Sequence, residues 1–174
     1  ERRRRDAVTE LARQREYDEP TNRRFHAQPN ACWDCGPRPE LWDSSGHRIE
    51  CSDPIGKAAA LLGDGRIVAV KGLGGFHLAA DATNASVVAT LRERKRRVGK
   101  PFAIMARDLV TIGKFCELDD SSRALLLGPE RPIVLVQKKE PSPIAAEVAP
   151  NIHELGVFLP YTPLHHLLFE GGGF

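Results

Sequence analysis

The stretch IVAVKGLGGFHLAA, residues 67–80, decides how the rest of the chain is interpreted. Residues 67–71 have the short apolar composition of a buried strand, and residues 76–80 have that of a second strand. The glycine-rich link between them can bring bare backbone amides close to phosphate oxygens, which the ammonium group of Lys71 can neutralise. The pattern predicts a phosphate-binding turn that is neither a P-loop nor a dinucleotide fingerprint; a purely structural turn fits the same residues.

Strand and helix signals alternate on both sides of this stretch. Asp53 followed by Pro54 predicts a helix start, and Asn84 predicts the cap of a helix that runs to about Arg97. Such alternation is typical of an α/β (α+β) domain with a twisted, mixed β-sheet flanked by helices. We place this domain at residues 53–174, after an irregular segment at residues 1–52. Further elements are predicted as strands at 101–106, 132–136 and 156–159 and as helices at 108–118, 121–127 and from 163 onward.

Composition and charge exclude several classes of protein. Apolar residues make up 41% of the 174 residues, as in a soluble globular domain, and no run reaches the roughly 18 apolar residues that a membrane span needs. Four cysteines are too few for a secreted disulfide scaffold. The sequence therefore predicts a cytoplasmic protein that does not contact a membrane.

The formal net charge is only +2, but positive side chains gather in the stretch LRERKRRVGKP, residues 91–101. Arg92, Lys95 and Arg96 share a helix face by their spacing, and cations suit the end of a helix. A solvated helix end accounts for such a run. Because Lys71 and its glycines precede this stretch by one strand and one helix, two elements of one sheet are also expected to present cations to one polyanion.

Cys32 and Cys35 form half of a zinc knuckle, since two thiolates on a tight turn suit a tetrahedral ion. The other two ligands would come from Cys51, His26, His47 or another chain. Cys116 is predicted to be a buried small residue. We find no nucleophile paired with a base in the sequence, which disfavours hydrolysis by a protein nucleophile.

Three stretches together closely resemble the HypF carbamoyltransferase family. They are NRRFHAQP at residues 22–29 leading into Cys32 and Cys35, KGLGGFHL with DATN at 71–78 and 81–84, and LPYTPLHH at 159–166. Their order and spacing match, and the resemblance covers the chain from about Glu16 onward. The Lys-x-Arg and Lys-Pro pairs of the YrdC-like module of this family correspond to residues 95–97 and 100–101.

The resemblance implies a multidomain enzyme in which the YrdC-like domain joins carbamate, derived from carbamoyl phosphate, to ATP. Carbamoyl-adenylate and pyrophosphate would form, and a further domain would pass the carbamoyl group to HypE to make the cyanide ligand of nickel-iron hydrogenases. Mg²⁺ is the implied companion of ATP, and Zn²⁺ would bind Cys32 and Cys35. The nucleotide-binding residues that it implies here are Lys71, Gly74, Gly75, Lys95, Arg97, Lys100, Thr162 and His165.

Two departures from the family pattern limit these expectations. Glu10 and Arg13 occupy the positions of the family's first cysteine pair, and the family's Ser-x-Asn segment does not occur. We therefore expect incomplete zinc binding and no turnover by the isolated chain. A double-stranded RNA-binding module of YrdC-like fold is the alternative function, and a structural spacer is a third. Threonylcarbamoyl-adenylate synthesis is set aside because those enzymes lack the segment at residues 22–29.

Overall fold

A computed structural model describes residues 14–22 and 36–172 of the chain. The chain divides into two compact units, Glu1–Glu40 and Leu41–Phe174. In the first unit, residues 14–18 form a short helix. The predicted metal ligands Cys32 and Cys35 lie outside the described residues, as do Glu10 and Arg13. None of the helices in the described ranges is long and apolar enough to cross a membrane.

Each of the five longer helices of the second unit begins at a side chain that accepts a hydrogen bond from a backbone N–H three residues later. The capping oxygen satisfies one of the donors that a helix start leaves without an intrahelical partner. The predicted caps Asp53 and Asn84 are confirmed, at 2.9 Å and 3.3 Å from the donor nitrogens. The helices are α2 (Pro54–Gly63), α3 (Ala85–Arg94), α4 (Leu109–Gly113), α5 (Asp120–Leu127) and α6 (Pro163–Gly171).

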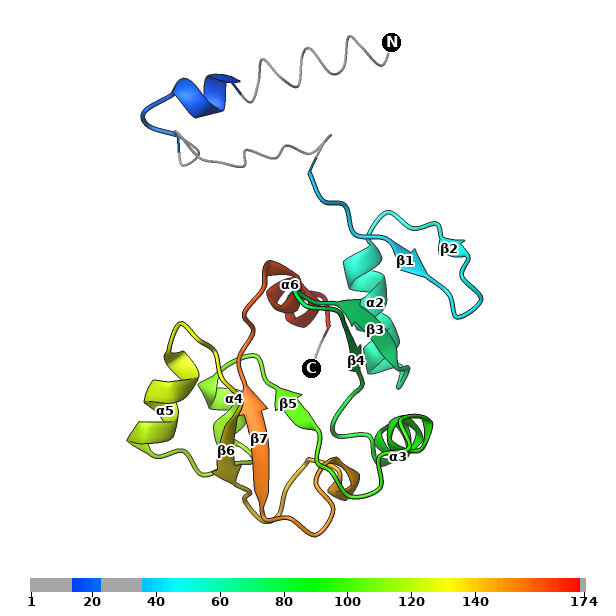
Figure 1. Ribbon diagram of the computed structural model, residues 1–174, viewed down its shortest axis with the longest axis vertical. Helices are drawn as coiled ribbons and strands as arrows, with labels where there is room; N and C mark the ends of the chain where they lie inside the picture. The colour runs from blue at the N-terminus through cyan, green and yellow to red at the C-terminus, as the bar shows by residue number, and fades with distance from the viewer. Residues whose placement is uncertain (1–13, 23–35, 173–174) are drawn as a thin grey trace. The chain divides into compact units, whose positions relative to one another are not determined.

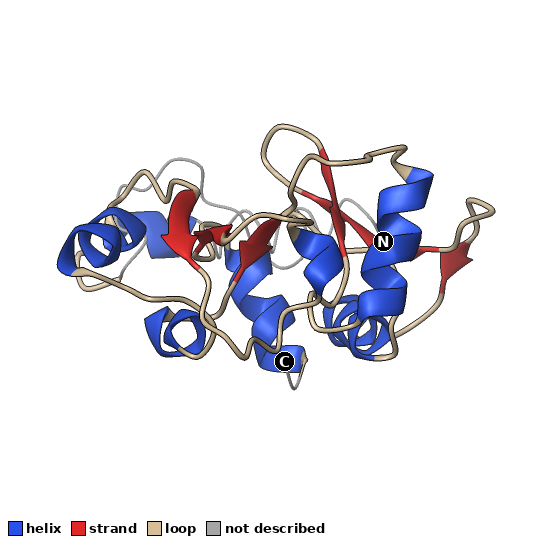
Figure 2. Ribbon diagram, turned by 90° about the horizontal axis from the view of Figure 1, so that it is seen from below, coloured by secondary structure: helices blue, strands red, loops and turns tan. Residues whose placement is uncertain are grey.

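The strands form a mixed three-stranded sheet and two hairpins (Figure 2). In the sheet, β7 (Glu154–Phe158) lies between β5 (Ala103–Met105), to which it is parallel, and β6 (Val134–Gln137), to which it is antiparallel. The hairpins are β1 (Leu41–Trp42) with β2 (Arg48–Ile49), and β3 (Val68–Lys71) with β4 (Phe76–Ala79). The mixed α/β class is confirmed, but within the described residues the β3–β4 hairpin is not hydrogen-bonded to the sheet that contains β5.

Two apolar clusters hold the second unit together. The larger one surrounds the three-stranded sheet and includes Leu155 and Val157 of the central strand, with a 3₁₀ helix, η1 (Ala146–Val148), at its border. In the smaller one, Val70 of β3 packs with Ala59 of α2 and Leu168 of α6. The helices α2 and α6 lie side by side (Figure 1). The smaller cluster thus fixes the β3–β4 hairpin against the helix that follows the sheet.

Two boundaries differ from those predicted, for local reasons. The helix predicted for 108–118 ends at Gly113, and Cys116 beyond it forms an antiparallel bridge with Lys138. The helix predicted to reach Arg97 ends at Arg94, and Arg96 has a φ of 48°. A left-handed residue cannot continue a right-handed helix. The cationic stretch is therefore mostly a loop.

Candidate functional site

The glycine turn of residues 72–75 joins β3 to β4, and the N–H of Gly72 donates to the carbonyl of Gly75 at 2.7 Å. Because cross-strand partners share a face, His77 lies on the same face of the hairpin as its partner Val70, which belongs to the smaller apolar cluster. Lys71 and its partner Phe76 face the other way, with the ammonium nitrogen 5.2 Å from the ring centre. The turn therefore directs His77, and not Lys71, towards the helices.

The start of α6 meets His77 on that inner face. The Thr162 hydroxyl accepts a hydrogen bond from the backbone N–H of His165 at 3.2 Å and so begins the helix. The ring of His165 lies 4.6 Å from that of Tyr161, edge to face, and 6.3 Å from that of His77. His77, Tyr161, Thr162 and His165, together with the glycine turn, are called the histidine group below.

His165 is buried, with 3% of its surface exposed, and its Nδ1 atom has no hydrogen-bond partner within the described part of the chain. Burial lowers the pKa of its imidazole, and the nearby His77 and His166 lower it further. The neighbouring His166 is exposed, as expected for two successive helical residues. His165 is thus a neutral polar side chain with a nitrogen that can bind a ligand atom.

The cationic loop, residues 95–100, contains the other predicted phosphate ligands. Lys95 and Lys100 are exposed. Arg97 is half-buried, and its guanidinium donates to the carbonyls of Lys100 at 3.0 Å and Pro101 at 2.6 Å. Two of its five N–H groups are therefore engaged within the loop itself, while the two lysines project their charge into solvent.

Among the residues of the basic stretch, Arg92 has the surroundings that differ most from those predicted from the sequence. Its spacing placed it on a solvated face with Lys95 and Arg96, yet it is half-buried and its guanidinium donates to main-chain carbonyls of the cationic loop and of η1. Its guanidinium also lies over the ring of Phe102, at 4.8 Å. The partners in η1 are 55 and 56 residues away in sequence, so no local pattern could have identified them.

The structure brings the predicted site residues together as two groups, not one. The cationic loop precedes β5, whereas Thr162 follows β7, and these strands are parallel with Ala103 opposite Gly156. The two groups therefore lie beyond opposite ends of the strand pair, with α6 at one end and α3 towards the other (Figure 1). Among the described residues, no hydrogen bond, ion pair or ring contact joins the cationic loop to the histidine group.

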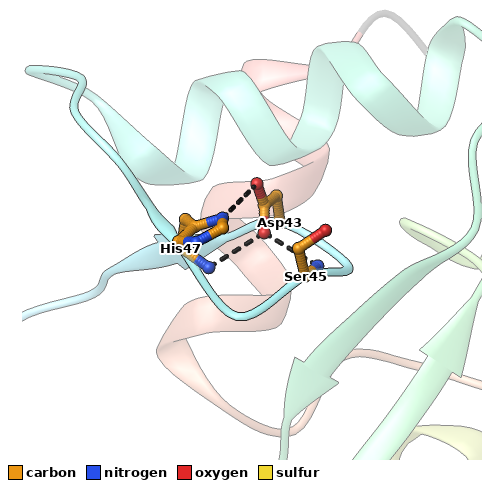
Figure 3. A network of polar contacts seen from close by, with 3 residues as sticks. All are labelled: Asp43, Ser45 and His47. Carbon is orange, nitrogen blue, oxygen red and sulfur yellow. Dashed lines mark hydrogen bonds and ion pairs between the residues drawn. The ribbon is translucent and has the colours of Figure 1, made fainter.

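The candidate zinc ligands His47 and Cys51 have other partners. His47 Nδ1 lies 3.5 Å from Asp43 Oδ2, and the Cys51 thiol contacts the carbonyl of Ile49 at 3.7 Å. Asp43 also accepts backbone hydrogen bonds from Ser45 and His47, which lower its pKa and close the β1–β2 hairpin (Figure 3). Within residues 14–22 and 36–172, no three His, Cys, Asp or Glu side chains are grouped so as to hold a metal ion.

Comparisons with known proteins identify both parts of the chain. Residues 60–173 match the Sua5–YciO–YrdC family model, described as telomere recombination, and residues 14–42 match the model of the HypF finger. The carbamoyltransferase HypF of Rhodobacter capsulatus is 53% identical over 158 residues, which are 91% of this chain and 21% of that protein. The chain thus spans about a fifth of the length of this relative.

Solved structures agree with the sequence comparisons. A full-length HypF in its phosphate- and nucleotide-bound form superposes with a TM-score of 0.83 at 47% identity, over 94% of this chain and 21% of that chain. YciO of E. coli, at 16% identity and a TM-score of 0.57, shares the fold over 68% of this chain and 59% of its own. The chain therefore belongs to the Sua5–YciO–YrdC family, and a segment that matches the HypF finger precedes the family domain.

Proposed function

We propose that this chain carries the carbamate-activating step of a HypF-type carbamoyltransferase. The observation that carries the proposal is the 47% identity, over nearly the whole chain, to a HypF that was solved with phosphate and nucleotide bound. In the proposed step, a carbamate oxygen attacks the α-phosphorus of ATP and the bond from that phosphorus to the β-phosphate oxygen breaks. Carbamoyl-adenylate and pyrophosphate are the products.

This reaction needs accurate placement of carbamate and ATP and neutralisation of the charge on the triphosphate. No protein nucleophile takes part in it. We assign the β- and γ-phosphates to the cationic loop, through Lys95, Arg97 and Lys100. The backbone amides of Gly74 and Gly75 would contact the nucleotide near the α-phosphate, with Thr162 and His165 beside it. Lys71, on the outer face of the hairpin, would attract the polyanion from a distance.

The two-group arrangement determines how the nucleotide would lie. Three strand residues span about 10 Å, so a ligand that touches both groups must extend along β5 and β7. The triphosphate end would meet exposed lysines, and the nucleoside and carbamate end would meet the neutral His165 and Tyr161. This orientation places the reacting α-phosphorus beside the glycine turn, away from the charges of the cationic loop.

The remaining cofactors and partners are part of the same proposal. Mg²⁺ would bridge the phosphates, with water and phosphate oxygens as its main ligands. Zn²⁺ would bind Cys32 and Cys35. Carbamate, formed from carbamoyl phosphate, is the proposed second substrate, and the carbamoyl group would pass to HypE and become the cyanide ligand of nickel-iron hydrogenase in the cytoplasm. We keep 53–174 as the proposed extent of the activating domain and 1–52 as the finger and linker.

Double-stranded RNA binding, the alternative that the sequence left open, is not favoured. Relatives of this chain are named carbamoyltransferases, and one related HypF was solved in a phosphate- and nucleotide-bound form. A basic loop alone attracts any polyanion, so it does not distinguish RNA from ATP. The comparisons therefore support an enzyme domain over an RNA-binding module.

The test of the proposal is calorimetric titration of ATP with Mg²⁺ into the 174-residue chain and two variants. Lys95→Ala/Lys100→Ala removes two exposed lysines whose side chains make no hydrogen bond or ion pair within the described residues. Lys114→Ala/Arg123→Ala removes the same charge from exposed positions on and beside α4 and α5. We expect the first variant to lose roughly 3 kcal/mol of binding free energy or more, at about 1.5–3 kcal/mol per charged hydrogen bond, and the second to match the unmodified chain.

Two results would remove parts of this proposal. Equal affinity of the Lys95→Ala/Lys100→Ala variant and the unmodified chain would remove the phosphate assignment. No heat of binding for ATP with the unmodified chain, in the presence or absence of carbamoyl phosphate, would remove the proposed nucleotide site itself.

A further inference from the structure

Arg92 ties the last turn of α3 to η1. Its Nε and Nη2 atoms both donate to the carbonyl of Glu147, at 2.9 Å and 2.7 Å, and Nη2 also lies 3.3 Å from the carbonyl of Val148. The Val148 carbonyl in turn accepts the backbone N–H of Phe102 at 2.9 Å. One guanidinium thus fixes η1 beside the residue that leads into β5.

The other edge of the same guanidinium binds the cationic loop. Nη1 donates to the carbonyl of Arg97 at 2.7 Å and lies 3.2 Å and 3.3 Å from those of Val98 and Lys100. The loop therefore curves around Arg92 with three carbonyls turned inward. The ring of Phe102 lies under both Arg92 and Arg97, at 4.8 Å and 5.1 Å.

This arrangement leaves Arg92 with few hydrogen-bond donors that could contact a substrate. Its donors point at carbonyl oxygens, and a planar fork can serve several such oxygens at once, whereas a lysine ammonium cannot reproduce that geometry. Of the loop residues whose carbonyls it binds, Val98 and Lys100 have exposed side chains. The charge of Arg92 is therefore used to shape the loop.

We propose that Arg92 is a positioning residue that holds the cationic loop in its nucleotide-binding form by clamping it to η1. The part of this inference that concerns nucleotide binding rests on the proposed function. The part that concerns the clamp rests on the hydrogen bonds alone. It differs from a direct phosphate contact in one measurable way. A direct contact depends on charge, which lysine retains, whereas a clamp depends on the fork of arginine, which lysine lacks.

The experiment compares Arg92→Lys with the matched control Arg94→Lys, an exposed arginine on the same helix. Limited trypsin digestion of the 174-residue chain, followed by mass spectrometry, measures cleavage after Arg96 and Arg97 relative to cleavage after Lys57, which lies inside α2 and becomes cleavable when that helix unfolds. We expect Arg92→Lys to raise this ratio at least about tenfold, since loss of the clamp opens the loop locally. Arg94→Lys should leave the ratio unchanged.

ATP titration at a temperature where both variants are folded completes the test. We expect the Kd of Arg92→Lys to rise at least about tenfold and that of Arg94→Lys to stay as in the unmodified chain. If Arg92→Lys does not fold, Phe102→Leu, which removes the ring beneath the guanidinium, takes its place with the same expected direction.

The outcomes separate the clamp from the proposed function. An unchanged cleavage ratio in Arg92→Lys overturns the clamp. A raised ratio with unchanged ATP affinity overturns the role of the clamp in nucleotide binding. If the unmodified chain does not bind ATP, the proposed function and the nucleotide half of this inference both fail, whereas the cleavage ratio still decides whether Arg92 holds the loop.

Discussion

The glycine turn allows a direct test of its two interpretations, as a phosphate contact or as a structural turn. Gly74 has no left-handed φ, and a Cβ atom added to it would meet nothing within 4 Å. Alanine is therefore compatible with the backbone at this position. A Gly→Ala change at such a site stabilises a protein by about 0.4–1 kcal/mol, because it restricts the unfolded chain.

Gly74→Ala should consequently keep or slightly raise the free energy of unfolding. If the backbone amides of the turn contact the nucleotide, the same methyl group would intrude where the phosphate approaches. We expect ATP affinity to fall at least about tenfold, or about 1.4 kcal/mol, while the thermal midpoint does not decrease. Thermal unfolding and calorimetric titration of the same preparation measure the two effects.

Gly72→Ala is the informative comparison at the other end of the turn. A Cβ there would lie 3.0 Å from the Cε1 and Nε2 atoms of His77 and 3.3 Å from the carbonyl oxygen of Gly75. This change should displace the His77 ring and lower stability, in contrast to Gly74→Ala. A Gly74→Ala chain that binds ATP as tightly as the unmodified chain would show that the turn has only a structural role.

Three further predictions concern stability and reactivity. The lowered pKa of His165 means that its contribution to stability is complete above the unfolded-state pKa of about 6.5 and is lost as pH falls towards the folded-state pKa, because the unfolded chain then binds more protons. As pH is lowered across this range, the free energy of unfolding measured in urea should fall less for His165→Gln than for His166→Gln. Equal decreases would contradict this account. Leu155→Ala, at a buried position of the central strand, should cost about 2–5 kcal/mol in urea unfolding, and a cost near zero would mean that β7 is not at the core. Burial raises the pKa of Cys116 to about 11, so iodoacetamide in mildly alkaline buffer should modify Cys51 well before Cys116 in the native chain, and mass spectrometry of the two peptides decides the order.

Local features of the fold were predictable because their causes are local. Asp53 and Asn84 cap helices through hydrogen bonds to residues three positions away, and such bonds depend only on neighbouring sequence. The glycine turn likewise joins two strands that are adjacent in sequence. The alternation of strand and helix signals predicted the mixed α/β class, which structural comparison confirms.

The role of the arginines could not be predicted from spacing, because spacing describes a helix surface without its neighbours. A half-buried guanidinium and a solvated one occupy the same position in a helical pattern. What separates Arg92 from Arg94 is the pair of η1 carbonyls, which the chain brings close only after about fifty further residues. The shortened α3 has the same origin, since the residues after Arg94 form a loop around that guanidinium.

Lys71 and His77 lie on opposite faces of the hairpin, as the alternation of side chains along a strand predicts from the sequence. Once Lys71 pairs with Phe76, strand alternation places Val70 and His77 together on the opposite face, and the apolar Val70 marks that face as the inner one. The inner face then places His77 beside the buried His165, whose Nδ1 atom has no hydrogen-bond partner among the described residues, while the exposed lysines lie beyond the other end of β5. The ligand that we propose to span both ends is polar and nearly uncharged at one end and strongly anionic at the other. A nucleoside triphosphate has that asymmetry, whereas duplex RNA, which is charged evenly along its length, does not.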